Sequence, residues 1–193
     1  MSLADIISNE DVIDIKSITN SNNISRQAVY NFIKNKKMEK VGPGIYILPG
    51  TIEDKAYTLF LRCPKGIISH DDALYYYGLI DREPINHSIT IYSGYNPSVL
   101  TKSGYKVFTI DKKLLNLGKT EVTNNFGHVI QMYDLERTIC DLMRSRSNYE
   151  IEDIKTALKS YVKRTDKNLN KLMDYAKKLD IEKLIKSYLK IIL

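Results

Sequence analysis

Near its amino end the chain passes from a dense turn signal through an amphipathic helix to a tight hairpin, and this order restricts the folds open to it. The run Asn20–Asn23 favours a turn. Ser25 is placed to cap the next helix, because its hydroxyl can accept a hydrogen bond from an orphan backbone N–H. That helix is predicted over Arg26–Asn35. Short apolar strands on either side of Gly42-Pro43-Gly44 then predict a hairpin.

The residues before this helix show apolar spacing typical of short elements. Leu3, Ile6 and Ile7 recur at helical spacing and predict a first helix. The apolar residues of 12–18 predict a second helix, although the alternation over 11–15 also permits a short strand. Both would pack on the apolar stripe of the third helix, which consists of Ala28, Val29, Phe32 and Ile33.

The other face of the third helix carries side chains that recognise bases and phosphates. Arginine pairs with guanine through two hydrogen bonds, and asparagine or glutamine pairs with adenine. The predicted base-contacting residues are Arg26, Gln27, Tyr30 and Asn31. The predicted phosphate-contacting residues are Lys34, Lys36, Lys37 and Lys40, with Pro43 at the tip of the hairpin.

Together these elements predict a winged helix-turn-helix, in which the wing is a hairpin that rests on the DNA backbone or in a minor groove. A small helical cap domain with a polar helix face is the structural alternative. The winged helix is favoured because helix, basic helix and hairpin occur in the right order. The sequence therefore predicts a DNA-binding domain over residues 1–50, with its boundary near Pro49-Gly50.

Basic residues are concentrated in two segments. The chain has 29 Lys and Arg against 23 Asp and Glu, a formal charge of +6. Residues 23–50 hold five basic residues and one acid, and residues 144–193 hold thirteen basic residues and seven acids. Such segments attract phosphate polyanions, although a charge run taken alone is more often a solvated face.

The remaining residues, 51–193, predict a mixed α/β domain, so the expected fold class of the chain is α+β. Residues 51–62 predict a linking helix. Apolar alternation predicts strands mainly within 85–133, at 88–92, 106–110 and 129–133. Helices are expected within 134–193: one that Asp134 caps and that ends at Arg144, then three near 150–162, 168–179 and 181–192.

Two local patterns in this domain carry specific expectations. Ser69 with Asp72 resembles a capping box and predicts a helix over 70–77. In the helix that follows Asp134, one apolar face is expected to turn inward, while Arg137 and Asp141 pair at i, i+4.

Three stretches occur in an order found in a known family. The first is Ile24–Pro49, with the basic helix and hairpin. The second is Ile68-Ser69-His70-Asp71-Asp72-Ala73-Leu74, followed by Tyr77-Gly78-Leu79. The third is Tyr133–Leu142, with Glu136-Arg137-Thr138 and Asp141-Leu142. Together they resemble the AbiEi-type antitoxins of the AbiE abortive-infection systems, which are type IV toxin–antitoxin systems.

The resemblance implies a cytoplasmic bacterial protein of phage defence with two roles. As a transcriptional autorepressor, it would bind double-stranded DNA at inverted repeats in its own promoter. As an antitoxin, it would counter a toxin that resembles a nucleotidyltransferase, without forming a stable complex with it. Inverted repeats also suggest that copies of the protein pair cooperatively on DNA.

The residues themselves indicate no enzyme, cofactor or metal site. His70, His87 and His128 are scattered and lack the His-x-x-x-His spacing of a zinc site. Ser69-His70-Asp71 is not expected to form a catalytic triad, because adjacent helical residues point in different directions, and His70 is expected to be structural. The apolar runs are too short to span a membrane, the start lacks a secretory signal, and the two cysteines fit a reducing cytoplasm.

Other functions stay open on the residues alone. A regulator whose second domain senses a small ligand would need a polar pocket within 60–145. A metal-dependent nuclease would use the acid-x-Lys spacings at Glu53 and Asp153, although neither acid follows a predicted strand. The candidate antitoxin surface, with an ordinary solvated face as its alternative, consists of Lys155, Lys159, Lys163 and Arg164.

Overall fold

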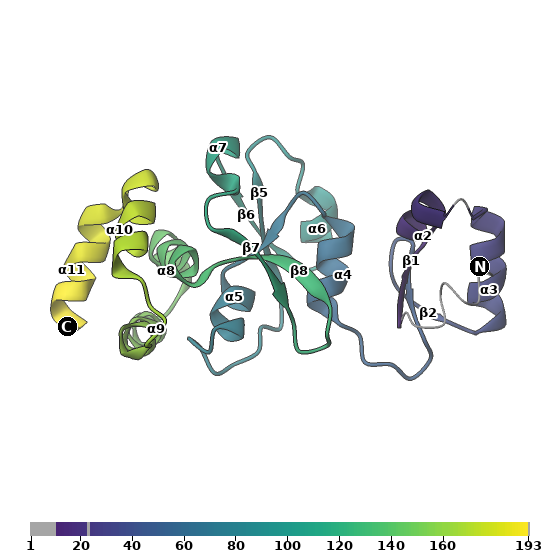
Figure 1. Ribbon diagram of the computed structural model, residues 1–193, viewed down its shortest axis with the longest axis horizontal. Coiled ribbons are helices and arrows are strands. Elements are labelled where there is room, and N and C mark those ends of the chain that lie inside the picture. Colours follow the sequence, from purple (N-terminus) through teal and green to yellow (C-terminus); the bar gives the residue numbers. More distant parts are fainter. Residues whose placement is uncertain (1–10, 23, 193) are drawn as a thin grey trace. The chain divides into compact units, whose positions relative to one another are not determined.

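A computed structural model describes residues 11–22 and 24–192, which form two compact units (Figure 1). The first unit ends at Cys63 and the second begins at Pro64. Each unit contains both helices and strands, so the predicted α+β class is confirmed. The helix predicted from Leu3, Ile6 and Ile7 lies outside the described residues.

The first unit combines a three-stranded antiparallel sheet with helices. Its described elements are β1 (Val12–Asp14), α2 (Ile15–Asn22), α3 (Arg26–Asn35), β2 (Glu39–Gly42), β3 (Ile45–Ile47) and α4 (Lys55–Arg62). The strand order is β1-β3-β2, which places β3 at the centre. Of the two alternatives left open over 11–15, the strand forms, and α2 follows it directly. The Asp14 carboxylate starts α2 by accepting from the backbone N–H groups of Lys16 and Ser17, both at 3.2 Å.

Two apolar clusters hold this unit together. One joins α2 and α3 to the sheet and consists of Ile13, Ile15, Ile18, Val29, Ile33 and Met38. In the other, Tyr57 and Leu61 of α4 pack on the buried side chains of Val12, Ile45 and Ile47. The helix predicted as a linker thus belongs to the first unit, and the boundary falls after Cys63 rather than near Pro49-Gly50.

The second unit is built on a five-stranded mixed sheet in the order β6-β5-β4-β8-β7. Its strands are β4 (Ile67–Ile68), β5 (Ser88–Tyr92), β6 (Lys106–Ile110), β7 (Lys119–Thr123) and β8 (Val129–Tyr133). Strand β4 pairs parallel with β8 and antiparallel with β5, while β6 lies parallel to β5 and β7 antiparallel to β8. Strands β5, β6 and β8 were predicted, whereas β4 is too short, and β7 too polar, to show a clear pattern.

Helices of the second unit are concentrated in its C-terminal half. They are α5 (Asp71–Tyr76), α6 (Ser98–Lys102), α7 (Lys112–Leu115), α8 (Leu135–Arg144), a 3-10 turn (Arg146–Asn148), α9 (Ile151–Lys163), α10 (Leu169–Lys178) and α11 (Glu182–Ile192). Figure 1 shows α8 to α11 gathered on one side of the sheet, with α8 in contact with the other three. The predictions for these four helices are confirmed within one residue at each end.

Helix α8 departs from its predicted pattern because it is buried on all sides. Every residue from Leu135 to Met143 is buried, including Arg137 and Asp141. The predicted i, i+4 pair is confirmed, with Arg137 Nε 3.1 Å from Asp141 Oδ2, but it lies inside the core. The cause is tertiary, since the neighbouring helices cover the face that would otherwise meet solvent.

The start of α5 also differs from the prediction, because no capping box forms. His70 occupies the N-cap position with φ 50° and makes no capping bond through its side chain. The Ser69 hydroxyl instead contacts Thr90 Oγ1 at 2.8 Å, and Asp72 Oδ2 accepts from the backbone N–H of Ser88 at 2.5 Å. The two side chains that the local spacing predicted to cap the helix thus bind strand β5 instead, which lies far away in sequence.

Candidate nucleic-acid interface

A cap and a buried stripe determine how α3 lies in the first unit. Ser25 Oγ accepts from the backbone N–H of Ala28 at 3.2 Å, as the sequence predicts. Val29 and Ile33 are buried in the cluster that joins α3 to α2 and the sheet. Because these side chains fix the rotation of the helix, the opposite face meets solvent.

All nine residues predicted to contact DNA are exposed. They are Arg26, Gln27, Tyr30, Asn31, Lys34, Lys36, Lys37, Lys40 and Pro43. Tyr30 is 47% exposed although it is aromatic. Gln27 Nε2 donates to Asn31 Oδ1 at 3.1 Å, which aligns the two amides along one side of the helix. We call the exposed side chains of Arg26, Gln27, Tyr30, Asn31 and Lys34 the α3 face.

The charge around the α3 face is not balanced by acids. The first turn of α3 contains no acidic residue. Among the described residues, the cations of the α3 face and of positions 36, 37 and 40 form no ion pairs, and Lys36 Nζ lies 6.0 Å from the centre of the Phe32 ring. Since the N-terminus of a helix is itself partly positive, this end of the first unit attracts anions.

The end of α3 places Lys37 in a backbone conformation that favours glycine. Lys37 has φ 53°, and the backbone N–H of Met38 donates to Ile33 O at 3.0 Å in a Schellman-type ending. A side chain in this left-handed region costs about 1 kcal/mol relative to glycine. The structure therefore keeps an exposed lysine where the backbone alone would favour glycine.

The predicted hairpin forms, with Pro43 and Gly44 as its two turn residues. Gly42 pairs with Ile45, and Gly44 has φ 76°, which suits the position after proline in a type II turn. A bulge lies between Lys40 and Gly42. Since type II turns splay the strands of a two-residue hairpin, the bulge allows the pairing to continue across the turn. Lys40 and Pro43 both remain exposed.

The proposed antitoxin residues differ from one another in their surroundings. Lys155, Lys159 and Lys163 are exposed at helical spacing along α9, and Lys155 Nζ pairs with Glu152 Oε1 at 2.8 Å. Arg164 follows the helix, donates from Nη1 to Tyr77 O at 2.7 Å, and contacts both carboxylate oxygens of Asp166. The three lysines thus share one face, whereas Arg164 is engaged in the structure of the unit.

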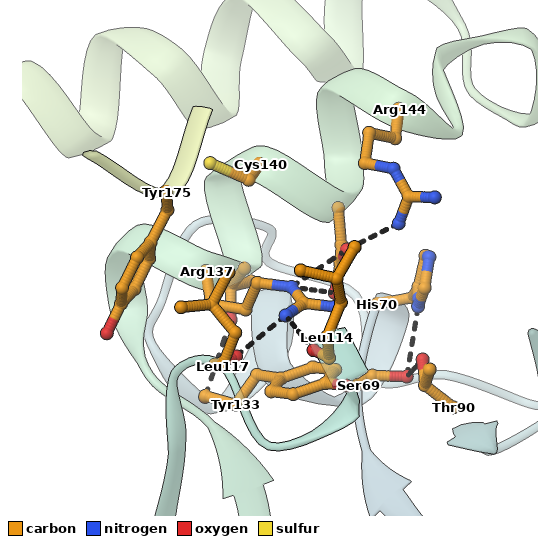
Figure 2. A network of polar contacts seen from close by, with 12 residues as sticks. Ser69, His70, Thr90, Leu114, Leu117, Tyr133, Arg137, Cys140, Arg144 and Tyr175 are labelled. Atoms are coloured by element: carbon orange, nitrogen blue, oxygen red, sulfur yellow. Dashed lines mark hydrogen bonds and ion pairs between the residues drawn. The ribbon is translucent and has the colours of Figure 1, made fainter. Parts of the chain in front are cut away.

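The third sequence stretch that carries the family resemblance forms a buried network around α8 (Figure 2). Arg137 Nε donates to both oxygens of Asp141 at 3.1 Å, and its Nη1 donates to Leu114 O and Leu117 O at 3.1 and 2.7 Å. The guanidinium also lies 4.0 Å from the centre of the Tyr133 ring. Arg137 therefore ties α8 to the end of α7, a role in the fold rather than in chemistry.

The second stretch forms another buried network at the start of α5. Asp72 Oδ1 accepts from His87 Nδ1 at 2.6 Å, and Asp72 Oδ2 accepts from Ser88 Oγ at 2.9 Å. Asp71, which neighbours His70 in sequence, accepts from Tyr149 and Lys106. No Ser-His-Asp triad forms within the stretch 69–71, because the described partners of Asp71 are these two side chains.

His70 is the one member of these networks with a strained backbone and a cavity beside it. Its ring stacks on Phe108 with 3.4 Å between ring centres, and it contacts Ser69 Oγ through Nδ1 and Ser145 Oγ through Nε2. Burial lowers the pKa of the imidazole from 6.5 to about 4, partly opposed by Asp141 and Asp71, so the ring is neutral at pH 7. A base this weak is poorly suited to remove protons near neutral pH.

Among the described residues of the second unit, cavities open beside His70 and beside Asp71. One, of about 240 Å³, borders His70, Ser145 and the arginines at 144 and 146. The other, of about 700 Å³, borders Asp71 and the loop 80–86. Sequence reasoning predicted neither, because their lining residues come from segments far apart in the chain.

The two acids of the nuclease alternative lie in different elements of the described chain. Glu53 precedes α4 in the first unit, and Asp153 lies in the first turn of α9 in the second. No group of three His, Cys, Asp or Glu side chains in residues 11–22 and 24–192 could hold a metal ion. Across the same residues, every helix is too short or too polar to cross a membrane.

Comparisons with known proteins show a similar fold. No protein-family model and no curated protein matches the chain. The crystal structure of the RV2827C protein from Mycobacterium tuberculosis matches with a TM-score of 0.62 and 12% sequence identity. The match covers 91% of this chain and 70% of that protein. The chain therefore shares its fold with the RV2827C protein.

Proposed function

We propose that the first unit is a winged helix-turn-helix that binds double-stranded DNA. The α3 face would enter the major groove, and the β2–β3 hairpin would act as the wing. The observation that carries this proposal is the exposure of the α3 face together with Lys36, Lys37 and Lys40, with no described acid paired to them. The side chains offered are those that contact base edges and phosphates in DNA complexes.

The same proposal assigns the chain the two roles implied by its resemblance to AbiEi-type antitoxins. It would repress its own operon by binding inverted repeats in the promoter, and it would counter a nucleotidyltransferase-like toxin. Both helical motifs of that resemblance lie in buried networks of the second unit. The motifs thus support a shared fold, and the antitoxin role needs its own test.

The DNA-binding proposal is tested by titrating the full chain against its own promoter and against random DNA. Lys36→Gln with Lys37→Gln should weaken binding to both, and it should reduce the slope of log K against log salt by about 1 for each lost phosphate contact. Asn31→Ala should instead reduce the preference for the promoter by about tenfold, since a bidentate base contact contributes on the order of 1–3 kcal/mol.

Lys102→Gln provides the matched control for these titrations. Lys102 is an exposed lysine of α6 in the second unit, so its removal takes away one charge outside the proposed interface. It should leave affinity, promoter preference and salt slope unchanged. An effect of the Lys102 variant about half as large as that of the Lys36 and Lys37 double variant, which removes two charges, would mean that net charge, and not the α3 face, drives binding.

The antitoxin role is tested by rescue of growth when the toxin gene is expressed. Lys159→Gln with Lys163→Gln should reduce rescue if the basic face of α9 carries the activity, because both side chains are exposed. Circular dichroism should show an unchanged fold for this variant. Full rescue by the double variant would exclude this face and favour an ordinary solvated surface.

A specific observation also supports the second function, a regulator that senses a small ligand. The polar cavity beside His70 lies in the second unit, as that hypothesis requires. Its lining extends beyond residue 145 to Arg146 and Ile181. The chemistry of that cavity decides which class of ligand it would take.

A further inference from the structure

The cavity beside His70 lies where the sheet meets the C-terminal helices. Its volume is about 240 Å³. Strands β5 and β6 contribute Thr90 and Thr109, and the segment at the end of α8 contributes Arg144, Ser145 and Arg146. His70 and Asp141 complete the polar part of the lining.

The charge of this cavity is positive. Its single carboxylate, Asp141, accepts from Arg137 Nε through both oxygens at 3.1 Å, so its charge is already balanced inside the core. Arg144 Nη1 reaches Asp141 Oδ1 only at 3.4 Å. Arg146 Nη1 donates to Met143 O at 3.3 Å and has no carboxylate partner among the described residues. Two guanidinium groups thus carry surplus charge at this cavity, and a bound anion would balance it.

His70 lines the cavity with a strained backbone and a ring held by two contacts. His70 has φ 50° and ψ −118°, a conformation that side chains rarely adopt. The Phe108 ring lies parallel to the imidazole at an interplanar angle of 6°, and Ser145 Oγ contacts Nε2 at 3.1 Å. This arrangement places the hydroxyl of Ser145 at the cavity between the arginines that flank it in sequence.

The volume of the cavity limits the size of its ligand. Drug-sized ligands occupy pockets of about 300–1,000 Å³. The cavity therefore suits a phosphate group with a small organic part rather than a whole nucleotide.

We propose that this cavity binds the phosphate group of a small anion no larger than a sugar phosphate, with Arg144 and Arg146 as charged ligands and Ser145 as a hydroxyl donor. Guanidinium groups match phosphate oxygens through paired hydrogen bonds, and a hydroxyl adds a third donor. The site lies wholly in the second unit, so it does not depend on DNA binding by the first.

The test is calorimetric titration of the full chain at constant ionic strength with inorganic phosphate, ribose 5-phosphate and AMP in turn. We expect one site per chain that binds ribose 5-phosphate or phosphate more tightly than AMP. Arg144→Gln and Arg146→Gln should each weaken that binding by about tenfold or more, because each removes a charge-assisted contact. Ser145→Ala, which keeps both charges, should weaken it less.

Arg82→Gln is the matched control, since Arg82 is an exposed arginine of the second unit that borders the other cavity. It should leave the binding constant unchanged, and circular dichroism should confirm that every variant is folded. Tighter binding of inorganic phosphate would identify free phosphate as the ligand, and tighter binding of ribose 5-phosphate would identify a phosphomonoester. Three results would overturn the proposal: no saturable binding of any probe, tightest binding by AMP, or equal losses in the Arg82 and Arg146 variants.

Discussion

At the scale of single residues, two left-handed side chains end helices in the same way but in different surroundings. Lys37 follows α3 with φ 53°, and Asp180 follows α10 with φ 56°. In both endings the next backbone N–H donates to a carbonyl five residues earlier, from Met38 to Ile33 and from Ile181 to Ala176. Comparing substitutions at these two positions therefore distinguishes the free-energy cost of the left-handed backbone from any role of the side chain in binding.

Lys37→Gly should stabilise the chain and weaken DNA binding at once. The glycine relieves a left-handed conformation that costs a side chain about 1 kcal/mol, while the proposed phosphate contact is lost. Asp180→Gly should give a similar gain in the free energy of unfolding with no change in DNA affinity. Urea denaturation and fluorescence anisotropy measure the two quantities. Unchanged DNA affinity in the Lys37 variant would remove this residue from the interface.

His70 should make the chain less stable as the pH falls. Its pKa is 6.5 in the unfolded chain and about 4 in the folded one, chiefly because burial disfavours the charged ring. Below pH 6.5 the unfolded chain takes up a proton that the folded chain does not, so stability is complete above that pH and is lost toward pH 4. The total loss is on the order of 3 kcal/mol.

Urea denaturation between pH 7 and pH 4.5 measures this dependence. His70→Gln should flatten it, because the variant has no group to titrate at this position. A wild-type slope in the His70 variant would assign the pH dependence to other groups.

At the scale of elements, the turn between α7 and β7 depends on close contact with α8. Gly118 has φ 77°, and a Cβ built on it would lie 2.6 Å from Arg137 Cβ and 3.1 Å from Tyr175 Cε2. Gly127, in the turn between β7 and β8, has φ 87° with nothing within 4 Å of such a Cβ. The two glycines thus share a backbone conformation and differ in the space around them.

Gly118→Ala should therefore destabilise the second unit far more than Gly127→Ala. Gly127→Ala should lower the free energy of unfolding by about 1 kcal/mol, the cost of the left-handed conformation alone. Gly118→Ala adds a steric clash with a buried side chain, so it should lower that free energy by about 3 kcal/mol or more. Thermal and urea denaturation of the two variants give the comparison. Equal losses would show that α8 can move away from this turn.

Arg137→Met should also destabilise the second unit strongly. It leaves the buried Asp141 with only the longer contact from Arg144, at 3.4 Å, and removes the donors to Leu114 O and Leu117 O, so we expect a loss of about 3 kcal/mol. The double variant with Asp141→Leu should recover part of this loss, since no buried charge then remains. A double-mutant cycle with urea denaturation measures the recovery. A double variant no more stable than Arg137→Met would contradict the pairing argument.

The sequence predicted correctly those features that depend on residues close together in the chain. Ser25 and Asp134 cap their helices as expected, because a cap depends on residues only three positions apart. The spacing of Ser69 and Asp72 correctly predicted a helix, observed as α5, but the predicted capping box was wrong, since strand β5 offers both side chains better partners. The cavity beside His70 could not be predicted, because its lining spans residues 70 to 181. Exposure of the α3 face was predictable, because the apolar stripe on the opposite side of the helix determines which side is buried.

At the scale of the whole molecule, separate apolar clusters stabilise the two units. The cluster around Val29 and Ile33 belongs to the first unit, and the large cluster around Ile139 and Leu158 belongs to the second. Each unit thus has a core of its own, as a folding domain requires. A defect in one core is therefore expected to show mainly within its own unit.

Val29→Ala should loosen the first unit and leave the second protected. Removing buried methyl groups from a side chain with 0% exposure costs about 2 kcal/mol. Hydrogen exchange followed by mass spectrometry should show faster exchange in peptides of 11–63 and unchanged rates in those of 64–192. Ala157→Gly removes a methyl group at a fully buried position of α9. It should give faster exchange in peptides of 64–192 and unchanged rates in those of 11–63. Faster exchange throughout the chain after either change would mean that the two units unfold together.

The buried pair of Arg137 and Asp141 also has a consequence for how the sequence can evolve. Losing Asp141 alone leaves the Arg137 guanidinium in the core without its carboxylate, and losing Arg137 alone leaves Asp141 only the longer contact from Arg144. Either single change is therefore costly unless the other position changes too. Apolar neighbours such as Leu142 face no such barrier and can drift among side chains of similar volume. We therefore expect distant descendants of a common ancestor to keep an arginine and an aspartate four positions apart after most other identities have disappeared.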